Sequence, residues 1–288
     1  MNPRTFFARL AAIEPLNFAV TNFFFRHALT RAMAGFSRIE HPWVRDASIA
    51  VWRAACDVDL SDAAQDNFAS LHAAFTRTLR PGARPFVDSP GVLASPCDGI
   101  VGGCGSIGAG TLIQAKGRQY ELADLLCDPG LADGLRGGAY VTLRLTAGMY
   151  HRFHAPDDLR VRRVVHVPGD VWNVNPPTLA RIDRVYCRNE RAVIEAQLAD
   201  GERLALVAVA AVLVSGIRLR FADLERAAQT LWPRAIPVDA RLSRGDEMGW
   251  FEHGSTIIVA APRGWELCDA VASGWRVRAG SPLLRRTT

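Results

Sequence analysis

Lysine is almost absent from this sequence of 288 residues. Lys116 is the single lysine, so 33 of the 34 basic residues are arginines, and the formal net charge is +5. An arginine guanidinium is planar and binds a phosphate through two hydrogen bonds at once, which a lysine ammonium does not do. The composition therefore favours an anionic surface as a partner.

Long apolar runs and closely paired cysteines are also missing. The longest uncharged apolar run, residues 204–217, falls short of the roughly 20 residues that a membrane-spanning helix needs. Glu14 and Pro15 interrupt the stretch in which a secretory signal would have its apolar core, so we expect no signal peptide. The six cysteines contain no Cys-x-x-Cys pair, which predicts reduced, mostly buried thiols in a cytoplasmic compartment.

Phenylalanine and basic charge are concentrated at the N-terminus. Seven of the 13 phenylalanines fall within residues 1–36, and residues 1–55 carry seven arginines against three acidic residues. This pattern predicts a helix lying in a membrane interface, because the triplet at residues 23–25 would place rings on more than one helix face. The alternative is a helical hairpin that packs its phenylalanines on the rest of the protein. The arginines are too sparse for a nucleic-acid partner.

A helical pattern gives way to a β pattern along the chain. Ser61 and Asp62 are typical of a helix start, apolar residues then recur at helical spacing as far as Leu79, and a stretch rich in Pro and Gly at residues 80–85 ends this helix. We expect an α+β fold, with a helical N-terminal region (residues 1–88) on a mostly antiparallel β core (residues 89–288). Alternating apolar residues at 141–145 predict a strand of that core, and the stretches at residues 161–167, 193–198, 204–214 and 256–260 predict further strands.

Three short clusters in the β part carry groups that can do chemistry. Asp98 precedes a glycine, which taken alone indicates a turn. His151 and His154 have no third ligand at suitable spacing, so we expect no metal and favour proton transfer near pH 7. Ser255 follows Gly254 at the entrance of an apolar run, a step that is most often a turn feeding a strand.

The Gly254-Ser255 step also permits a reaction within the chain. Gly254 has no side chain, so its carbonyl carbon is open to attack by the Ser255 hydroxyl. If β-elimination breaks the resulting ester, Ser255 becomes dehydroalanine, and hydrolytic loss of ammonia leaves a pyruvoyl group at a new chain start. Asp98, His154 and Ser255 supply the parts of a nucleophilic triad, although composition alone does not select these three. An ordinary triad hydrolase is the alternative.

Around these clusters the sequence resembles the phosphatidylserine decarboxylase family, in its longer bacterial form, from about residue 70 to residue 285. The most specific piece of the resemblance is Tyr150-His151-Arg152-Phe153-His154-Ala155-Pro156. Other segments match in the family's order: residues 75–85, Ser95-Pro96-Cys97-Asp98-Gly99, Gln114-Ala115-Lys116-Gly117, Tyr120-Glu121-Leu122, Pro168-Gly169-Asp170, Val174-Asn175, Arg188-Asn189-Glu190-Arg191, Gly245-Asp246-Glu247-Met248-Gly249 and Gly254-Ser255-Thr256.

The resemblance implies a proenzyme that cleaves itself between Gly254 and Ser255 into chains 1–254 and 255–288. Ser255 would become the pyruvoyl cofactor, and Asp98 and His154 would form the processing triad with it. His151 would donate or accept a proton while phosphatidylserine is converted to phosphatidylethanolamine and CO2, with the pyruvoyl group accepting the electrons that the departing carboxylate releases.

The resemblance further implies a bacterial enzyme of phospholipid biosynthesis at the cytoplasmic face of the membrane, peripherally bound to its anionic surface, and it suggests a homodimer. The alternatives are a decarboxylase of another serine-headed lipid, such as an ether lipid, and a non-catalytic lipid-binding relative. Two positions depart from the family's pattern. His253 stands where a bulky apolar residue is usual, and Asp157-Asp158 stands where a looser turn is usual.

Overall fold

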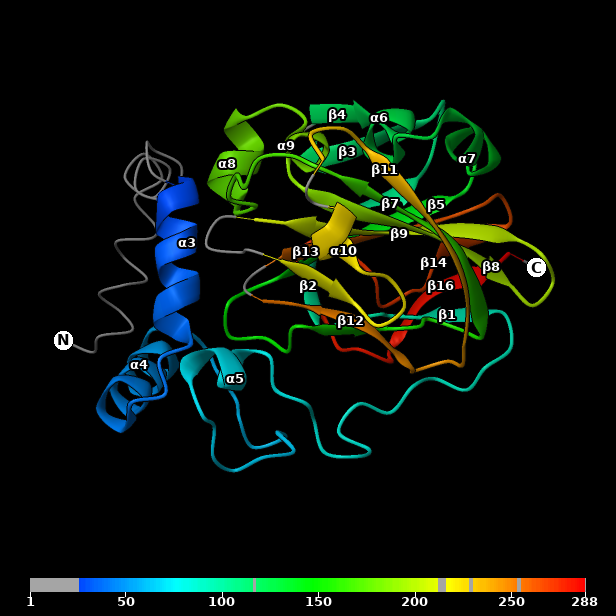
Figure 1. Cartoon of the computed structure of the whole chain (residues 1–288). Helices are drawn as coiled ribbons and strands as arrows, with labels where there is room; N and C mark the ends of the chain where they lie inside the picture. The colour runs from blue at the N-terminus through cyan, green and yellow to red at the C-terminus, as the bar shows by residue number, and fades with distance from the viewer. Residues whose placement is uncertain (1–25, 116–117, 212–215, 228–229, 253–254, 288) are drawn as a thin grey trace.

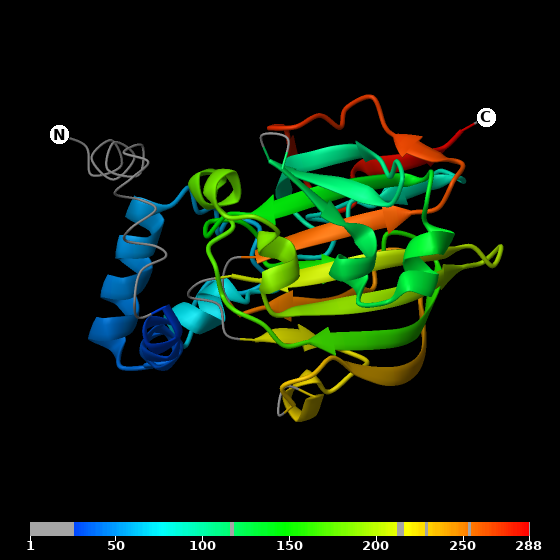
Figure 2. The ribbon, with the colours of Figure 1, turned by 90° about the horizontal axis from the view of Figure 1, so that it is seen from above.

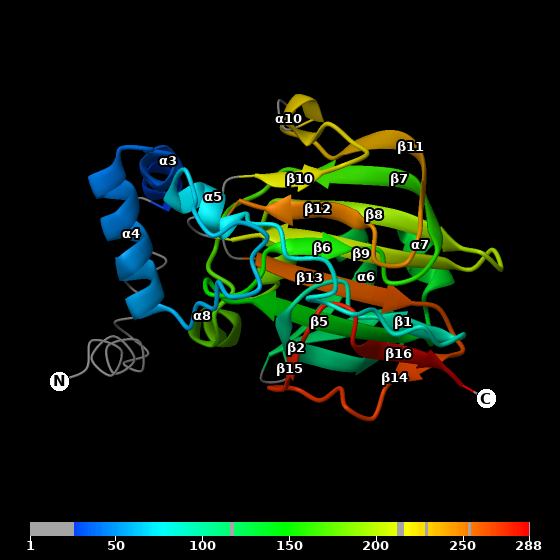
Figure 3. The same ribbon diagram turned by 90° about the horizontal axis from the view of Figure 1, so that it is seen from below.

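The computed structural model describes residues 26–115, 118–211, 216–227, 230–252 and 255–287. A helical lobe from the N-terminal part of the chain stands beside one end of a β-rich body (Figures 1, 2 and 3). The described ladders between named strands are antiparallel, so the expected α+β class with a mostly antiparallel core is confirmed. The phenylalanine-rich residues 1–25 lie outside the described residues.

In the part of the chain that the structure describes, the lobe consists of α3 (Arg26–Ser37), α4 (Pro42–Ala55) and α5 (Leu71–Phe75). Pro42 opens α4 at a position where the missing N–H is harmless, because the first-turn N–H groups of a helix have no partner within it. Side chains of α4 and α5, among them Trp52 and Phe75, pack into a small apolar core of their own. The Trp52 indole N–H donates to the carbonyl of Ala147 at 3.1 Å, which ties the lobe to the body.

The predicted helix from Ser61 to Leu79 is wrong in its start and its length. Ala63 forms a β-bridge with Leu79, which draws most of this stretch into turns. The helix is the short α5, and its first turn is capped by the Ser70 hydroxyl, which accepts a hydrogen bond from a backbone N–H at 3.2 Å. A long-range contact has therefore overridden a local helical pattern.

The body is built on an eight-stranded sheet in the order β11-β7-β8-β9-β13-β5-β2-β15, accompanied by the smaller sheets β1-β16-β14, β10-β12-β6 and β3-β4. The strands are β1 (Val92–Ala94), β2 (Gly99–Ser106), β3 (Thr111–Ala115), β4 (Arg118–Glu121), β5 (Ala139–Leu145), β6 (Arg152–His154), β7 (Leu159–Val167), β8 (Arg191–Leu198), β9 (Arg203–Ala210), β10 (Ile217–Leu219), β11 (Arg234–Leu242), β12 (Glu247–Phe251), β13 (Ser255–Ala261), β14 (Trp265–Leu267), β15 (Arg276–Val277) and β16 (Pro282–Arg286). Short helices lie between them: α6 (Leu122–Leu126), α7 (Pro129–Gly134), α8 (Pro176–Arg181), α9 (Val185–Arg188) and α10 (Leu224–Ala227).

Strand β13 lies inside the large sheet, between β5 and β9. All seven of its residues are buried, as expected for a strand that is covered on both faces. Ser255 is its first residue and pairs with Leu145 of β5 and Ala210 of β9. The start of β13 points toward the helical lobe (Figures 2 and 3). The fold therefore buries Ser255 at the end of the sheet nearest α3, α4 and α5.

The predicted strands at residues 141–145, 161–167, 193–198 and 256–260 are confirmed as parts of β5, β7, β8 and β13. The predicted strand at residues 204–214 matches β9 as far as Ala210, and residues 212–215 lie outside the described residues. None of the described helices combines the length and the apolar character that a membrane span requires.

The six cysteines are free thiols, but the expectation that most are buried was wrong. Only Cys97 is buried, Cys127 is exposed, and the other four are half-buried. Burial raises the pKa of the Cys97 thiol well above its usual value, so Cys97 packs as a small neutral residue.

Candidate functional site

Ser255 lines a cavity of about 320 Å³ at the boundary between the helical lobe and the sheet. Met33, Trp52, Leu71 and Phe75 form its apolar wall on the side of the lobe. The wall on the side of the sheet is formed by the last two residues of β5, by residues 146–147 that follow it, and by residues 173–175 and Ala211. Within the described part of the chain the buried Ser255 hydroxyl has no hydrogen-bond partner. A buried polar atom without a partner is costly, so the position of this hydroxyl calls for an explanation.

Glu252 anchors the segment that leads to Ser255. Its side chain is 9% exposed and forms ion pairs with Arg38 at the end of α3, at 2.9 Å, and with Arg218 of β10, at 3.1 Å. The backbone N–H of Glu252 also donates to the carbonyl of Gly216 at 3.2 Å. The next residues in the chain, His253 and Gly254, lie outside the described residues, and so does the predicted cleavage bond between Gly254 and Ser255.

His151 is fully buried next to the Ser255 cavity. Its ring packs against the ring of Phe75 with centroids 3.9 Å apart, and Phe75 in turn lines the cavity. The Nδ1 atom lies 2.8 Å from the carbonyl oxygen of Met149. A carbonyl only accepts, so Nδ1 carries a proton and the ring is held in one orientation. His151 therefore lies behind Phe75, whose ring separates it from the cavity that Ser255 lines.

His154 makes two hydrogen bonds, neither of them to Asp98 or Ser255. Nδ1 donates to the Gly245 carbonyl at 2.9 Å, which leaves the lone pair on Nε2 to accept from the Tyr150 hydroxyl at 2.9 Å. Burial lowers the pKa of the His154 imidazole, partly offset by the bond to Gly245. Burial also raises the pKa of Tyr150. His154 is therefore a neutral base whose lone pair is occupied by a phenol.

Asp98 is held by an arginine. Arg84 donates two hydrogen bonds to its carboxylate, at 2.8 and 2.7 Å, and the backbone N–H of Ala279 donates a third at 2.9 Å. The Asp98 carboxylate raises the pKa of the Arg84 guanidinium through these bonds. Arg84 also lies over the ring of Tyr150, 5.9 Å from its centroid. Asp98 and His154 are thus connected through Arg84 and Tyr150, and the predicted direct triad stays a prediction.

Sequence reasoning missed the partners that set these geometries. Tyr150 and Arg84 belong to segments that match the family, but the sequence pattern assigns neither of them a role. Phe75 was read as one apolar residue of a helix. Only the packing of α5 and residues 80–90 against the body shows that these three side chains surround the histidines and Asp98.

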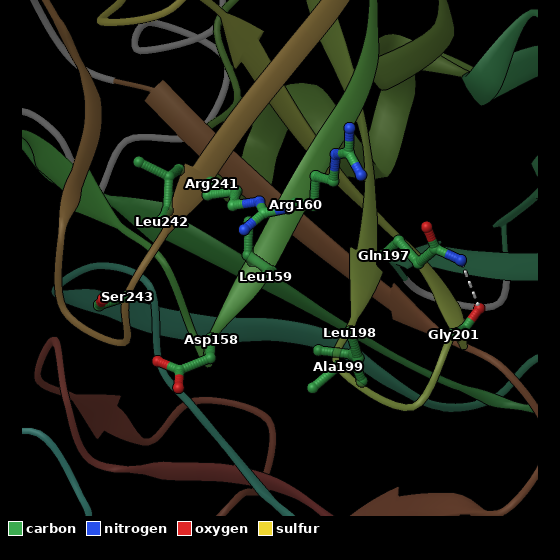
Figure 4. Close-up of a pocket in the computed structure, with 10 residues that line it drawn as sticks. All are labelled: Asp158, Leu159, Arg160, Gln197, Leu198, Ala199, Gly201, Arg241, Leu242 and Ser243. Carbon is green, nitrogen blue, oxygen red and sulfur yellow. Dashed lines mark hydrogen bonds between the residues drawn. The ribbon is translucent and has the colours of Figure 1, made fainter.

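A second cavity, of about 550 Å³, does not include Ser255, and Figure 4 shows the residues that line it. Its walls come from β7, β8 and β11, and the Gln197 amide donates to the Gly201 carbonyl at its rim at 3.1 Å. Gln197 pairs with Arg203 at the start of β9, whereas Ser255 pairs with Ala210 at the end of β9. Seven residues of strand, about 23 Å, separate the two ends. None of the predicted site residues lines this cavity.

Comparisons with known proteins identify the family of this chain. The family pattern of phosphatidylserine decarboxylase matches residues 71–285. A protein from Anaeromyxobacter sp. (strain K), named phosphatidylserine decarboxylase proenzyme, is 37% identical over 90% of this chain and 94% of its own. Proteins of the same name from Pseudomonas fluorescens and Bordetella pertussis are 34% and 35% identical, over 92% and 89% of this chain and 96% and 90% of theirs. This chain belongs to the phosphatidylserine decarboxylase family.

Proposed function

We propose that this protein cleaves itself at Gly254-Ser255 and then decarboxylates phosphatidylserine to phosphatidylethanolamine. The observation that carries the proposal is the Ser255 hydroxyl, buried without a partner among the described residues in the wall of a largely apolar cavity. A stable serine in such a place would lose hydrogen bonds without compensation, whereas a serine that becomes a ketone loses its hydroxyl. The residues around Ser255 therefore fit a pyruvoyl group.

For self-cleavage we assign the base to His154. Its Nε2 lone pair can take the Ser255 proton only when the Tyr150 hydroxyl gives up that position, because an imidazole nitrogen has one lone pair. The lowered pKa of His154 keeps the ring neutral and ready to accept a proton at neutral pH. Asp98 supports this assembly through Arg84, which it fixes beside the Tyr150 ring.

For decarboxylation the protein's own residues position the substrate and exchange the proton that replaces CO2. A pyruvoyl group formed from Ser255 would supply the electron acceptor that the breaking carbon–carbon bond requires. His151 lies behind Phe75 with its Nδ1 committed to the Met149 carbonyl, so Nε2 is the atom that exchanges the proton replacing CO2. The apolar wall excludes water from that exchange.

We further propose that a lipid reaches this site along the helical lobe. An apolar groove of about 630 Å³ runs along α3 and α4 and shares Met33, Trp52 and Leu71 with the Ser255 cavity. Trp43 and Val51, at 84% and 64% exposure, stand on this groove. A peripheral protein that draws a phospholipid from an anionic bilayer needs such a path, and we place it at the cytoplasmic face of the membrane.

Turnover on defined vesicles tests the proposal. The purified chain should release CO2 from phosphatidylserine vesicles, and His151→Ala should be cleaved normally yet lose at least about 100-fold in kcat, the usual range for a missing proton donor. Equal turnover on an ether analogue with a serine headgroup would widen the substrate to serine-headed lipids. A cleaved protein that binds vesicles but releases no CO2, with His151→Ala indistinguishable, would support a non-catalytic lipid-binding relative instead.

A further inference from the structure

Arg144 of β5 stands between the Ser255 cavity and a neighbouring cavity, and lines both. The neighbouring cavity has a volume of about 430 Å³, and Leu179 and Tyr186 form part of its wall. Arg144 pairs across the sheet with Thr256, the residue after Ser255. Adjacent strands lie about 4.8 Å apart, so the Arg144 backbone is one strand away from the reacting residue.

The charge of Arg144 lacks a counterion in the part of the chain that the structure describes. Burial lowers the pKa of its guanidinium, and Tyr186 is the group that opposes this effect. Two other arginines around the site do have carboxylate partners: Arg84 binds Asp98, and Arg152 binds Glu247 at 2.8 Å. A half-buried guanidinium without a carboxylate is costly unless a ligand supplies the negative charge.

We propose that Arg144 binds the phosphodiester of the phospholipid substrate. This inference rests on the proposed function and names the group that recognises the lipid's headgroup. A guanidinium matches two phosphate oxygens through parallel hydrogen bonds. The serine amine that reaches the Ser255 position is separated from phosphorus by two carbons and one oxygen, a span of about 4–5 Å from ordinary bond lengths. Arg144 lines the same cavity as Ser255, which places it close enough to contact a phosphate bound there.

The substrate has a second anion, its carboxylate, and the chemistry decides between the two. The carboxylate loses its charge as CO2 leaves, so a cation bound to it would stabilise the substrate more than the transition state and would slow the reaction. The phosphodiester keeps its charge throughout. Binding it holds the lipid equally in both states, which lowers KM and leaves kcat nearly unchanged.

Kinetics of Arg144→Gln and Arg144→Lys, in the full-length protein, test this assignment. We expect both variants to be cleaved like the wild type. Arg144→Gln should raise KM for phosphatidylserine vesicles about tenfold or more with kcat within about twofold, and Arg144→Lys should recover part of the loss. Glycerophosphoglycerol, a soluble phosphodiester without an amine, should inhibit the wild type competitively and Arg144→Gln several-fold less. Arg136→Gln, which removes an exposed arginine paired with Asp133, is the matched control and should change nothing.

Several outcomes would overturn the assignment. If Arg144→Gln is cleaved and active with an unchanged KM and unchanged inhibition, Arg144 does not bind the phosphate, and the proposed function stands. A raised kcat would instead place Arg144 at the substrate's carboxylate. If Arg144→Gln is not cleaved, binding is measured in the uncleaved Ser255→Ala background, through fluorescence of Trp52 in the cavity wall. Equal affinity for glycerophosphoglycerol with and without Arg144 would then refute the proposal. Failure of the wild type to release CO2 concerns the proposed function alone.

Discussion

Replacing Glu252 with glutamine should slow self-cleavage, because Glu252 holds the residues just before the Gly254-Ser255 bond. The carboxylate binds Arg38 and Arg218, whose side chains are 49% and 30% exposed. Solvent reduces the Arg38 pair to roughly 0.2–1 kcal/mol, and the more buried Arg218 contact contributes about 1–2 kcal/mol. Glutamine keeps the shape but removes the charge that pairs with both arginines, and Arg218 keeps Glu225 as its other partner. The loss is therefore roughly 1–3 kcal/mol.

We call the ion pairs of Glu252 with Arg38 and Arg218 the Glu252 clamp. If this clamp determines how often the residues before Ser255 are positioned for cleavage, the lost free energy converts directly into a slower rate of self-cleavage. With about 1.4 kcal/mol for each factor of ten, the half-time of cleavage should lengthen by roughly 5-fold to 100-fold. The assay is a time course of newly translated protein on a denaturing gel, following the full chain and the fragment 1–254. Asp46→Asn, which removes the exposed Arg45–Asp46 pair of α4, is the control.

If Glu252→Gln cleaves itself as fast as the wild type, the ion pairs of Glu252 do not position the residues before Ser255. A double-mutant cycle with Arg38→Gln adds a second check. The two changes should combine to less than the sum of their separate effects, because they remove one shared interaction. Strictly additive effects would show that the Arg38 contact does not act through Glu252.

Three further predictions concern Tyr150, His154 and the helical lobe. Tyr150→Phe removes the hydroxyl that occupies His154 Nε2 and should speed self-cleavage by about 2-fold to 10-fold, the equivalent of one neutral hydrogen bond; slower cleavage would contradict that competition. The pKa of His154 is lower in the folded protein than in the unfolded chain, so the unfolded chain binds more protons at mildly acidic pH. The free energy of unfolding should therefore fall as the pH drops through about 6.5. His154→Gln should lessen that fall, as measured by urea titrations at several pH values. Trp43→Ser should weaken binding to anionic vesicles severalfold in a sedimentation assay, whereas Trp275→Ser, at an exposed tryptophan on the body, should not.

The sequence predicted features that depend on neighbours in the chain. Ser255 was expected at the entrance of a strand, and it is the first residue of β13, because a glycine before an apolar run is a local signal. The helix expected from Ser61 failed because Ala63 pairs with Leu79, a contact that no local pattern encodes.

The partners of the catalytic candidates were beyond sequence reasoning for a related reason. Asp98 has many arginines as possible partners, and only the fold brings Arg84 to it. His154 lies four residues from Tyr150, yet the ring that accepts from the Tyr150 hydroxyl is oriented by the carbonyl of Gly245, which lies 91 positions away in the chain. Sequence patterns select residue types for a reaction, whereas burial and pairing decide which atoms are available.

The mass of the protein's fragments tests the central claim most directly. Purified wild-type protein should give a fragment ending at Gly254 and a fragment of residues 255–288 whose first residue carries a ketone, seen as a mass that shifts on borohydride reduction. Ser255→Ala should remain one chain of 288 residues. An intact wild-type chain without a reducible carbonyl, or a 255–288 fragment that begins with an ordinary serine, would contradict the conversion of Ser255 into the cofactor.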